Sequence, residues 1–154
     1  MESIDQYKYF LENMSVKILN GQKKPNKAIM LLSVIDLIRC GYIIKNKICI
    51  EDTIQEAFDF NWRKYIDPNP PSCWTPFWHL KNEPFWHFKP KISQNRINSL
   101  TNPGETASLS KMKSAISYAF LDDNLFLLMS KPEGRTILSE VLIKTYININ
   151  TENG

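Results

Sequence analysis

An almost continuous apolar segment from Ala28 to Ile38, interrupted only by Ser33 and Asp36, constrains the fold more than any other feature. It is far shorter than the ~20 residues that a bilayer-spanning helix needs, so we predict no membrane span. We predict instead a largely buried helix from Lys27 to Arg39, ended by Gly41. With 154 residues and 43% hydrophobic content, the chain is long enough to bury this helix in the core of a single domain.

Further helices are predicted from apolar periodicity and from residues that can cap a helix. Ser3–Gln6 forms a capping box, and Asp52 or Thr53 can cap a later helix. Ser108 or Ser110 can cap another one. The predicted helical ranges are about 4–19, 52–65, 108–120, 125–129 and 132–146.

A near-repeat predicts an aromatic hairpin. Residues Pro76–Lys81 (PFWHLK) return almost unchanged as Pro84–Lys89 (PFWHFK). Two aromatic strands across a tight turn are the simplest interpretation. A second hairpin is predicted between residues 42–44 and 48–50, which are rich in β-branched and aromatic side chains. The aperiodic residues 90–107 are predicted to form a long loop.

Together these elements predict an α+β fold, a mainly helical single domain with two short β-hairpins. The domain is expected to span residues 1–147 and to be followed by a polar tail at 148–154. All four tryptophans lie within 25 residues, between Trp62 and Trp86. This concentration predicts one aromatic core layer in which Trp78 and Trp86 are structural.

Basic residues are unevenly distributed along the chain. The net charge of +3 and the pI of about 8.7 are weak evidence for nucleic-acid binding. The eleven residues 17–27, however, contain four lysines and no acid, whereas acids cluster at 51–59. Lys24 and Lys27 also lie at the start of a helix, where positive charge is unfavourable unless an anion is recruited. A phosphate would relieve that conflict, and a solvated basic loop is the alternative interpretation.

Cysteine and histidine usage favours neither a metal site nor a catalytic centre. The three cysteines are expected to be reduced thiols in the cytoplasm. Cys73, His79 and His87 lack the paired spacing of zinc ligands, so no metal or other cofactor is expected. Both histidines lie in the aromatic segment, so no catalytic residues are assigned and no enzyme activity is expected in this chain. Asp122 and Asp123 are interpreted as helix-boundary residues.

Three stretches of the chain, and the order in which they occur, are similar to a known protein family. They are Lys24–Ile38, which leads into the apolar helix, the aromatic segment Pro76–Phe88, and Ser110–Asp122. Their order resembles the sulfur-binding domain of HNH-type, modification-dependent restriction endonucleases of bacteria, over nearly the whole chain. That family commonly has a His-Lys-Pro-like sequence where this chain has residues 26–28 (NKA), so its base preference is expected to differ.

The resemblance implies a non-catalytic domain that binds double-stranded DNA carrying phosphorothioate linkages. It also implies a bacterial, cytoplasmic targeting module in defence, with nuclease activity in a separate domain of the same or another chain. Such domains seat the sulfur in a shallow apolar pocket. The candidates here are Thr75, Pro76 and His79, because a proline ring offers a rigid apolar patch without an N–H donor.

Basic and amide side chains are the candidates for the remaining DNA contacts. Arg96, Lys111 or Lys113 could neutralise the modified linkage. Gln22 and Asn26 could pair with adenine, and neighbouring lysines could reach guanine, although turn formation is the alternative role for this segment. The candidate DNA-binding set is Gln22, Lys23, Lys24, Asn26, Lys27, Arg96, Lys111 and Lys113.

Two functions from other classes remain open at this point. A protein-interaction or assembly module would use exposed aromatic residues, and its association would be insensitive to salt. A small nuclease with an unrecognised site would cleave modified DNA in a manner that depends on a divalent metal.

Overall fold

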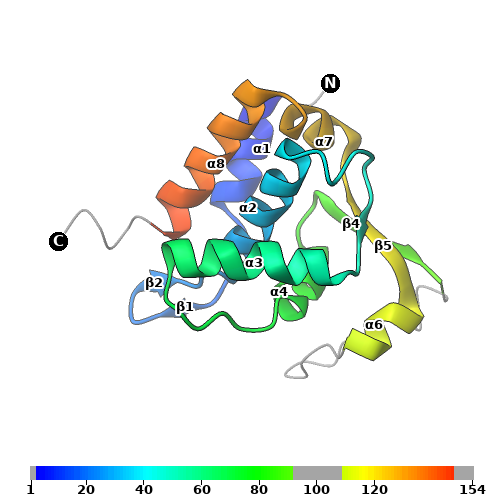
Figure 1. Cartoon of the computed structure of the whole chain (residues 1–154). Helices are drawn as coiled ribbons and strands as arrows, with labels where there is room; N and C mark the ends of the chain where they lie inside the picture. The colour runs from blue at the N-terminus through cyan, green and yellow to red at the C-terminus, as the bar shows by residue number, and fades with distance from the viewer. Residues whose placement is uncertain (1–2, 92–108, 148–154) are drawn as a thin grey trace.

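Helix α2 (Asn26–Arg39) lies at the centre of the structure, and the other long helices pack around it (Figure 1). This computed structural model describes residues 3–91 and 109–147. Four consecutive side chains of α2, from Ala28 to Leu31, are completely buried. Gly41 follows the helix with a φ of +85°, a value typical of a helix end. The predicted buried helix is therefore confirmed.

The other elements surround α2 in the following order. The helices are α1 (Ile4–Glu12), α3 (Asp52–Tyr65), α4 (Trp74–His79) with the 3-10 helix η1 (Leu80–Asn82), α6 (Leu109–Ala115), α7 (Asp123–Met129) and α8 (Pro132–Tyr146). The strands are β1 (Ile18–Leu19), β2 (Gln22–Lys23), β3 (Ile48–Cys49), β4 (Trp86–Pro90) and β5 (Ile116–Leu121). In the described residues the strands form two small antiparallel sheets, β1-β2 and β3-β5-β4, so the predicted mainly helical α+β fold is confirmed. None of the described helices combines the length and apolar character of a membrane span.

The first helix ends at Glu12 rather than near residue 19, which corrects the prediction. Strand β1 replaces its last part, and β2 replaces the loop expected from residue 22. Asn20 and Gly21 connect these strands with φ values of +53° and +77°. Positive φ at both central residues defines a type I′ turn, the connection that best matches the twist of paired strands. This turn outweighs the helical spacing of the apolar residues before it.

The predicted pairing of residues 42–44 with 48–50 is also wrong. The amides of Tyr42 and Ile43 both donate to the Leu37 carbonyl, each at 3.0 Å. They complete the C-terminal end of α2 and are therefore unavailable for a hairpin. Strand β3 pairs with β5 instead, with Ile48 opposite Ala119.

The near-repeat does not form a hairpin, because its two copies have different secondary structures. The first copy is helical, in α4 and η1, and the second copy forms β4, which pairs with β5. The copies still contact each other through their rings. Phe77 meets Trp86 edge-on at 5.3 Å, and Trp78 stacks on Phe88 at 5.1 Å between centroids. All four tryptophans are buried, which confirms the predicted aromatic core.

The segment predicted as one helix from residue 108 to 120 changes structure at Ala115. Helix α6 ends there, and the chain continues directly as β5. Strand β5 is the central strand of its sheet, with β3 on one side and β4 on the other. This pairing on both edges outweighs the local helical pattern.

The remaining helix predictions are confirmed for α3, α7 and α8. The predicted N-cap of α3, Asp52 or Thr53, is wrong. Glu51 occupies the N-cap position, and its side chain makes no capping hydrogen bond. Asp122 is the residue before α7, but its carboxylate accepts from Tyr7 Oη at 2.9 Å and lies 2.6 Å from His87 Nε2. The predicted loop after residue 91, with Arg96, and the tail at 148–154 lie outside the described residues.

Candidate nucleic-acid interface

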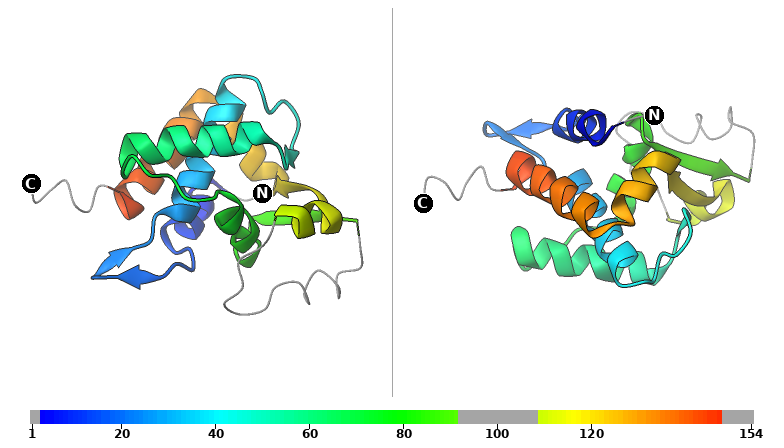
Figure 2. Two further views of the ribbon diagram at one scale, coloured as in Figure 1. Left: turned by 60° about the horizontal axis from the view of Figure 1, so that its bottom comes forward. Right: turned by 90° about the horizontal axis from the view of Figure 1, so that it is seen from above.

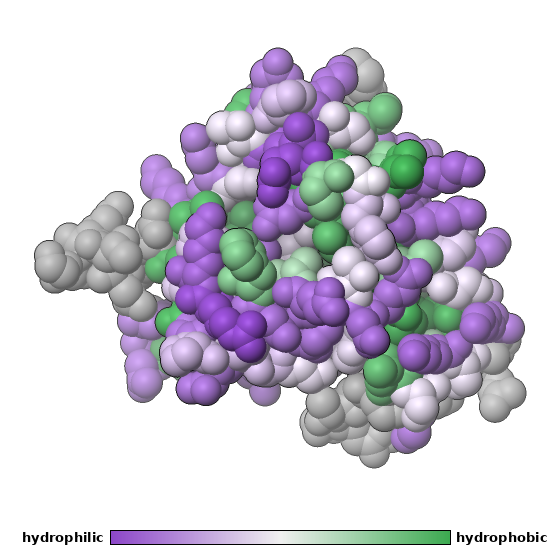
Figure 3. All heavy atoms as spheres, viewed as in Figure 1, coloured by the Kyte–Doolittle hydropathy of each residue, from purple (hydrophilic) through white to green (hydrophobic). Residues whose placement is uncertain are grey.

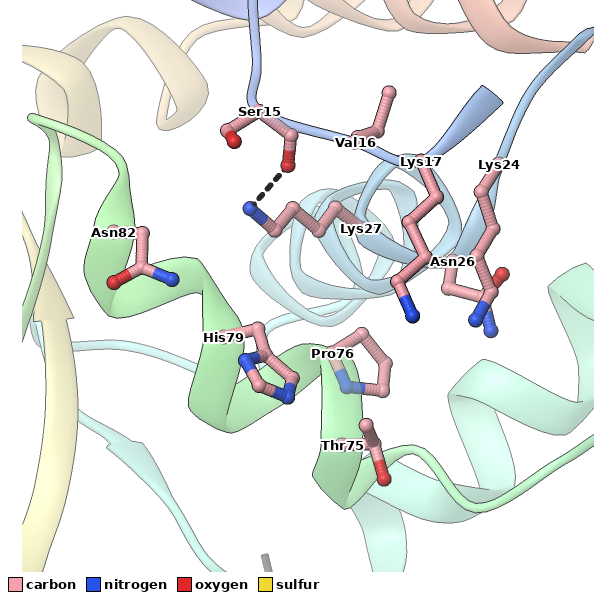
Figure 4. Close-up of a pocket in the computed structure, with 10 residues that line it drawn as sticks. All are labelled: Ser15, Val16, Lys17, Lys24, Asn26, Lys27, Thr75, Pro76, His79 and Asn82. Atoms are coloured by element: carbon pink, nitrogen blue, oxygen red, sulfur yellow. Dashed lines mark hydrogen bonds between the residues drawn. The ribbon is translucent and has the colours of Figure 1, made fainter. Parts of the chain in front are cut away.

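A pocket of about 510 Å³ opens between three segments that are distant in sequence (Figure 4). The segment before β1 forms one wall, the start of α2 forms the second, and α4 with η1 forms the third. The lining residues are Ser15, Val16, Lys17, Lys24, Asn26, Lys27, Thr75, Pro76, His79 and Asn82. The structure thus brings together all three predicted sulfur-pocket residues and three of the predicted DNA-binding residues.

Helix α4 positions the predicted pocket residues, although a strand was expected there. Pro76 lies in the first turn of this helix, where its missing N–H costs no intrahelical bond. Thr75 and His79 are four residues apart and therefore lie on one side of the helix. All three residues line the pocket, and the Pro76 ring and the His79 imidazole lie opposite Lys17, whereas the Thr75 hydroxyl points away from the lysines (Figure 4). The pocket surface supplied by α4 thus combines a proline ring, a threonine and an imidazole.

Lys27 is held by a buried ion pair that the sequence did not reveal. Its Nζ lies 2.6 Å from Glu83 Oε2 and donates to the Ser15 carbonyl at 2.7 Å. The same carboxylate oxygen accepts from the Ser15 amide at 3.0 Å. The Lys27 and Glu83 side chains are only 10% and 4% exposed. The positive charge at the start of α2 is therefore balanced by a carboxylate of the chain itself.

Lys17 and Lys24 are the exposed cations of the pocket. Their backbones are joined, because the Lys24 amide donates to the Lys17 carbonyl at 2.8 Å. Both side chains lie on the same side of the pocket as Asn26 (Figure 4). Within the part of the chain that the structure describes, neither ammonium group forms an ion pair. Lys17 was noted in the basic stretch but was not among the predicted contacts.

Asn26 carries a buried polar atom that faces no partner. It opens α2 and lines the pocket. Its Oδ1 is buried and accepts no hydrogen bond from the described residues. Buried polar atoms without a partner are uncommon in folded proteins. A donor on a bound ligand would satisfy this oxygen.

His79 is kept neutral by its surroundings. Burial lowers the pKa of its imidazole below the usual 6.5. The positive charge of Lys27, Lys81, Lys17 and Lys24 lowers this pKa further. The pocket therefore combines an uncharged imidazole with a positive electrostatic potential.

The lowered pKa of His79 predicts a loss of stability in acid. The unfolded chain binds a proton at this site near pH 6.5, before the folded chain does. Because the unfolded state then binds more protons, the free energy of unfolding should fall as the pH drops below about 6.5. Urea unfolding at pH 7.5 and at pH 5.0 measures this loss. It should be smaller in His79→Gln than in the wild type, and equal losses would contradict the argument.

The C-terminal end of α8 is hydrogen-bonded to the segment that leads into one wall of the pocket. The hydroxyl of Tyr146 donates to the Leu11 carbonyl and accepts from the Met14 amide at 3.1 Å. Burial raises the pKa of this hydroxyl to about 12. Lys23 Nζ lies 5.5 Å from the centre of the same ring. These contacts fix the segment that leads from α1 into the pocket wall.

The other predicted contact residues lie around the pocket or away from it. Gln22 and Lys23 form β2 next to the pocket wall. Lys111 and Lys113 lie on α6, which is separated from the β1-β2 hairpin by α4 (Figure 2, left). The structure therefore does not bring these two lysines into the pocket lining. Within residues 3–91 and 109–147 no three metal-ligating side chains cluster.

Comparison with known proteins identifies the fold. No family model matches the chain, and no curated protein matches its sequence. The fold is that of a sulfur-binding domain, as the sequence predicted. The structure is similar to that of the sulfur-binding domain of SprMcrA complexed with phosphorothioated DNA. The TM-score is 0.70 over 94% of this chain and 86% of the other, at 14% sequence identity.

Proposed function

We propose that this chain is a DNA-binding domain that recognises phosphorothioated duplex DNA and seats the sulfur in the pocket beside Pro76. One observation carries the proposal: Thr75, Pro76 and His79 meet Lys24 and Asn26 in a single pocket. The shared fold with a domain solved on phosphorothioated DNA supports the same ligand. The catalytic step of restriction is assigned to a separate nuclease domain, which this bacterial, cytoplasmic module would direct to modified DNA.

The chemistry of the pocket favours sulfur over oxygen. Sulfur is larger, softer and less hydrated than the oxygen it replaces, and burying a methylene-sized group contributes about 0.8 kcal/mol. An oxygen placed against the Pro76 ring would lose water without gaining a hydrogen bond, at a cost of about 1–3 kcal/mol. The two effects together allow roughly tenfold to several-hundredfold discrimination.

The charge of the linkage would be balanced by the lysines at the pocket mouth. Lys17 and Lys24 are exposed there, whereas Lys27 is already paired with Glu83. Lys111 and Lys113 on α6, together with Arg96, are proposed to contact phosphates farther along the duplex. Asn26 and Gln22 are the proposed contacts to base edges, whereas Lys23, whose Nζ lies over the Tyr146 ring, is proposed as a contact to the DNA backbone.

The face of the molecule seen in Figure 3 gives less support to a protein-interaction module. On the face viewed in Figure 3, apolar residues are scattered among hydrophilic ones rather than gathered into one patch. Protein interaction sites are usually marked by contiguous apolar patches. The basic rim of the pocket is better suited to a polyanion.

A paired binding titration tests the proposal. Two duplexes that differ in one phosphorothioate linkage are titrated at ~150 mM salt, which screens nonspecific phosphate attraction. The modified duplex should bind at least about tenfold more tightly, and Pro76→Ser should remove most of this difference. Pro84→Ser is a control for loss of a proline outside the pocket lining, at the equivalent position of the near-repeat. Because Pro76 is buried and Pro84 is exposed, urea unfolding should show that both variants are folded under the binding conditions. Equal affinities of the wild type for both duplexes would refute the sulfur pocket.

A further inference from the structure

The β1-β2 hairpin presents two faces with different surroundings. Its cross-strand pairs are Ile18 with Lys23 and Leu19 with Gln22. The hydrogen bond from the Lys24 amide to the Lys17 carbonyl continues the pairing by one step. Side chains alternate between the two faces of a strand, and cross-strand partners share a face. Leu19 and Gln22 therefore lie on the same face as Lys17 and Lys24.

The environment of the lysines shows where each face points. Lys17 and Lys24 line the pocket, so the face that they share with Leu19 and Gln22 is the pocket face. Lys23 points the other way, over the Tyr146 ring and 3.5 Å from the Glu12 carbonyl. Ile18 belongs to this rear face. The hairpin extends away from the helices beside the pocket (Figures 1 and 2).

Leu19 is an exposed apolar residue on the same face of the hairpin as Lys17 and Lys24. Its side chain is 60% exposed, although it lies on an ordered strand next to a tight turn. Two residues along a strand span about 6.6–6.8 Å. Duplex DNA advances by about 3.4 Å per base pair along its axis. The Leu19–Gln22 pair is therefore displaced from the Lys17–Lys24 pair, along the strand, by a distance equal to about two base-pair steps.

We infer that the pocket face of the hairpin enters the major groove and reads a base pair about two steps from the modified linkage. The inference rests on the proposed function and adds a source of sequence preference to it. A two-stranded ribbon fits the major groove, which is about 12 Å wide. The amide of Gln22 suits adenine, and the apolar Leu19 suits the methyl group of thymine. Both side chains therefore favour an A·T pair at this position.

A duplex series with one fixed phosphorothioate tests the inference. The base pair at each of three positions on either side of the linkage is changed between A·T and G·C. Wild-type binding should weaken at least about fivefold when one position about two steps away becomes G·C. Replacing thymine by deoxyuridine at that position removes only the methyl group and should weaken binding about threefold.

Two single variants separate the faces of the hairpin. Leu19→Ala should abolish the sensitivity to deoxyuridine but keep the preference for sulfur. Ile18→Ala is the matched control, because Ile18 is similarly exposed, at 65%, and lies on the rear face of the same hairpin. It should leave the sensitivity intact. A sulfur preference without any base preference, or equal responses of both variants, would overturn the inference alone. If the wild type bound modified and unmodified duplexes equally well, the proposed function would be overturned as well.

Discussion

Glu83→Leu is expected to lower the free energy of unfolding by about 3–5 kcal/mol. The substitution leaves the Lys27 ammonium group buried without its partner, and the Ser15 amide loses its acceptor. A buried charge without compensation is among the most destabilising changes available to a folded protein. Urea denaturation measures the loss.

A double variant identifies the cause of this loss. Lys27→Met combined with Glu83→Leu removes both charges and should recover much of the stability, because apolar groups can replace a buried ion pair at little cost. Glu56→Leu, at an exposed position of α3, should change stability by less than about 1 kcal/mol. If the single and double variants were equally unstable, the buried charge would not explain the effect.

Trp86→Ala is expected to cost about 3–5 kcal/mol, a loss of similar size from a different cause. Trp86 is 1% exposed on β4 and packs edge-on against Phe77 of α4. Its removal leaves a cavity between the sheet and the helix that carries the pocket residues. Thermal or urea unfolding should show that Trp86→Phe retains more stability than the alanine variant. Phe60→Ala, which removes an aromatic ring that is 63% exposed, serves as the control.

The sequence predicted best those elements whose structure is determined locally. Helices α2, α3, α7 and α8 carry their apolar spacing within a few turns, and Pro132 occupies the first turn of α8. The near-repeat was predicted wrongly because its two copies are almost identical in sequence but differ in their neighbours. Only the second copy has β5 available as a pairing strand. Such long-range pairing cannot be read from a hexapeptide.

Six of the residues named from the sequence line the candidate pocket, but the geometry of the pocket could not be predicted from the sequence. Thr75 and Pro76 lie about 50 residues from Lys24 and Asn26 in sequence, and the fold joins them. Periodicity offered no sign that Lys27 would meet Glu83, because the two residues belong to segments that pack only in the folded chain. The Asn20–Gly21 turn, by contrast, was a local signal that the helical spacing around it obscured.

Tyr146 gives the C-terminal end of α8 a mechanical connection to the candidate pocket. Its hydroxyl bonds to the backbone at Leu11 and Met14, and Lys23 lies over its ring. A displacement of the C-terminal end of α8 would therefore alter the contacts that hold the pocket wall and the rear face of the hairpin. The C-terminal end of α8, the segment that leads into the pocket wall and the rear of the hairpin thus share the contacts of one side chain.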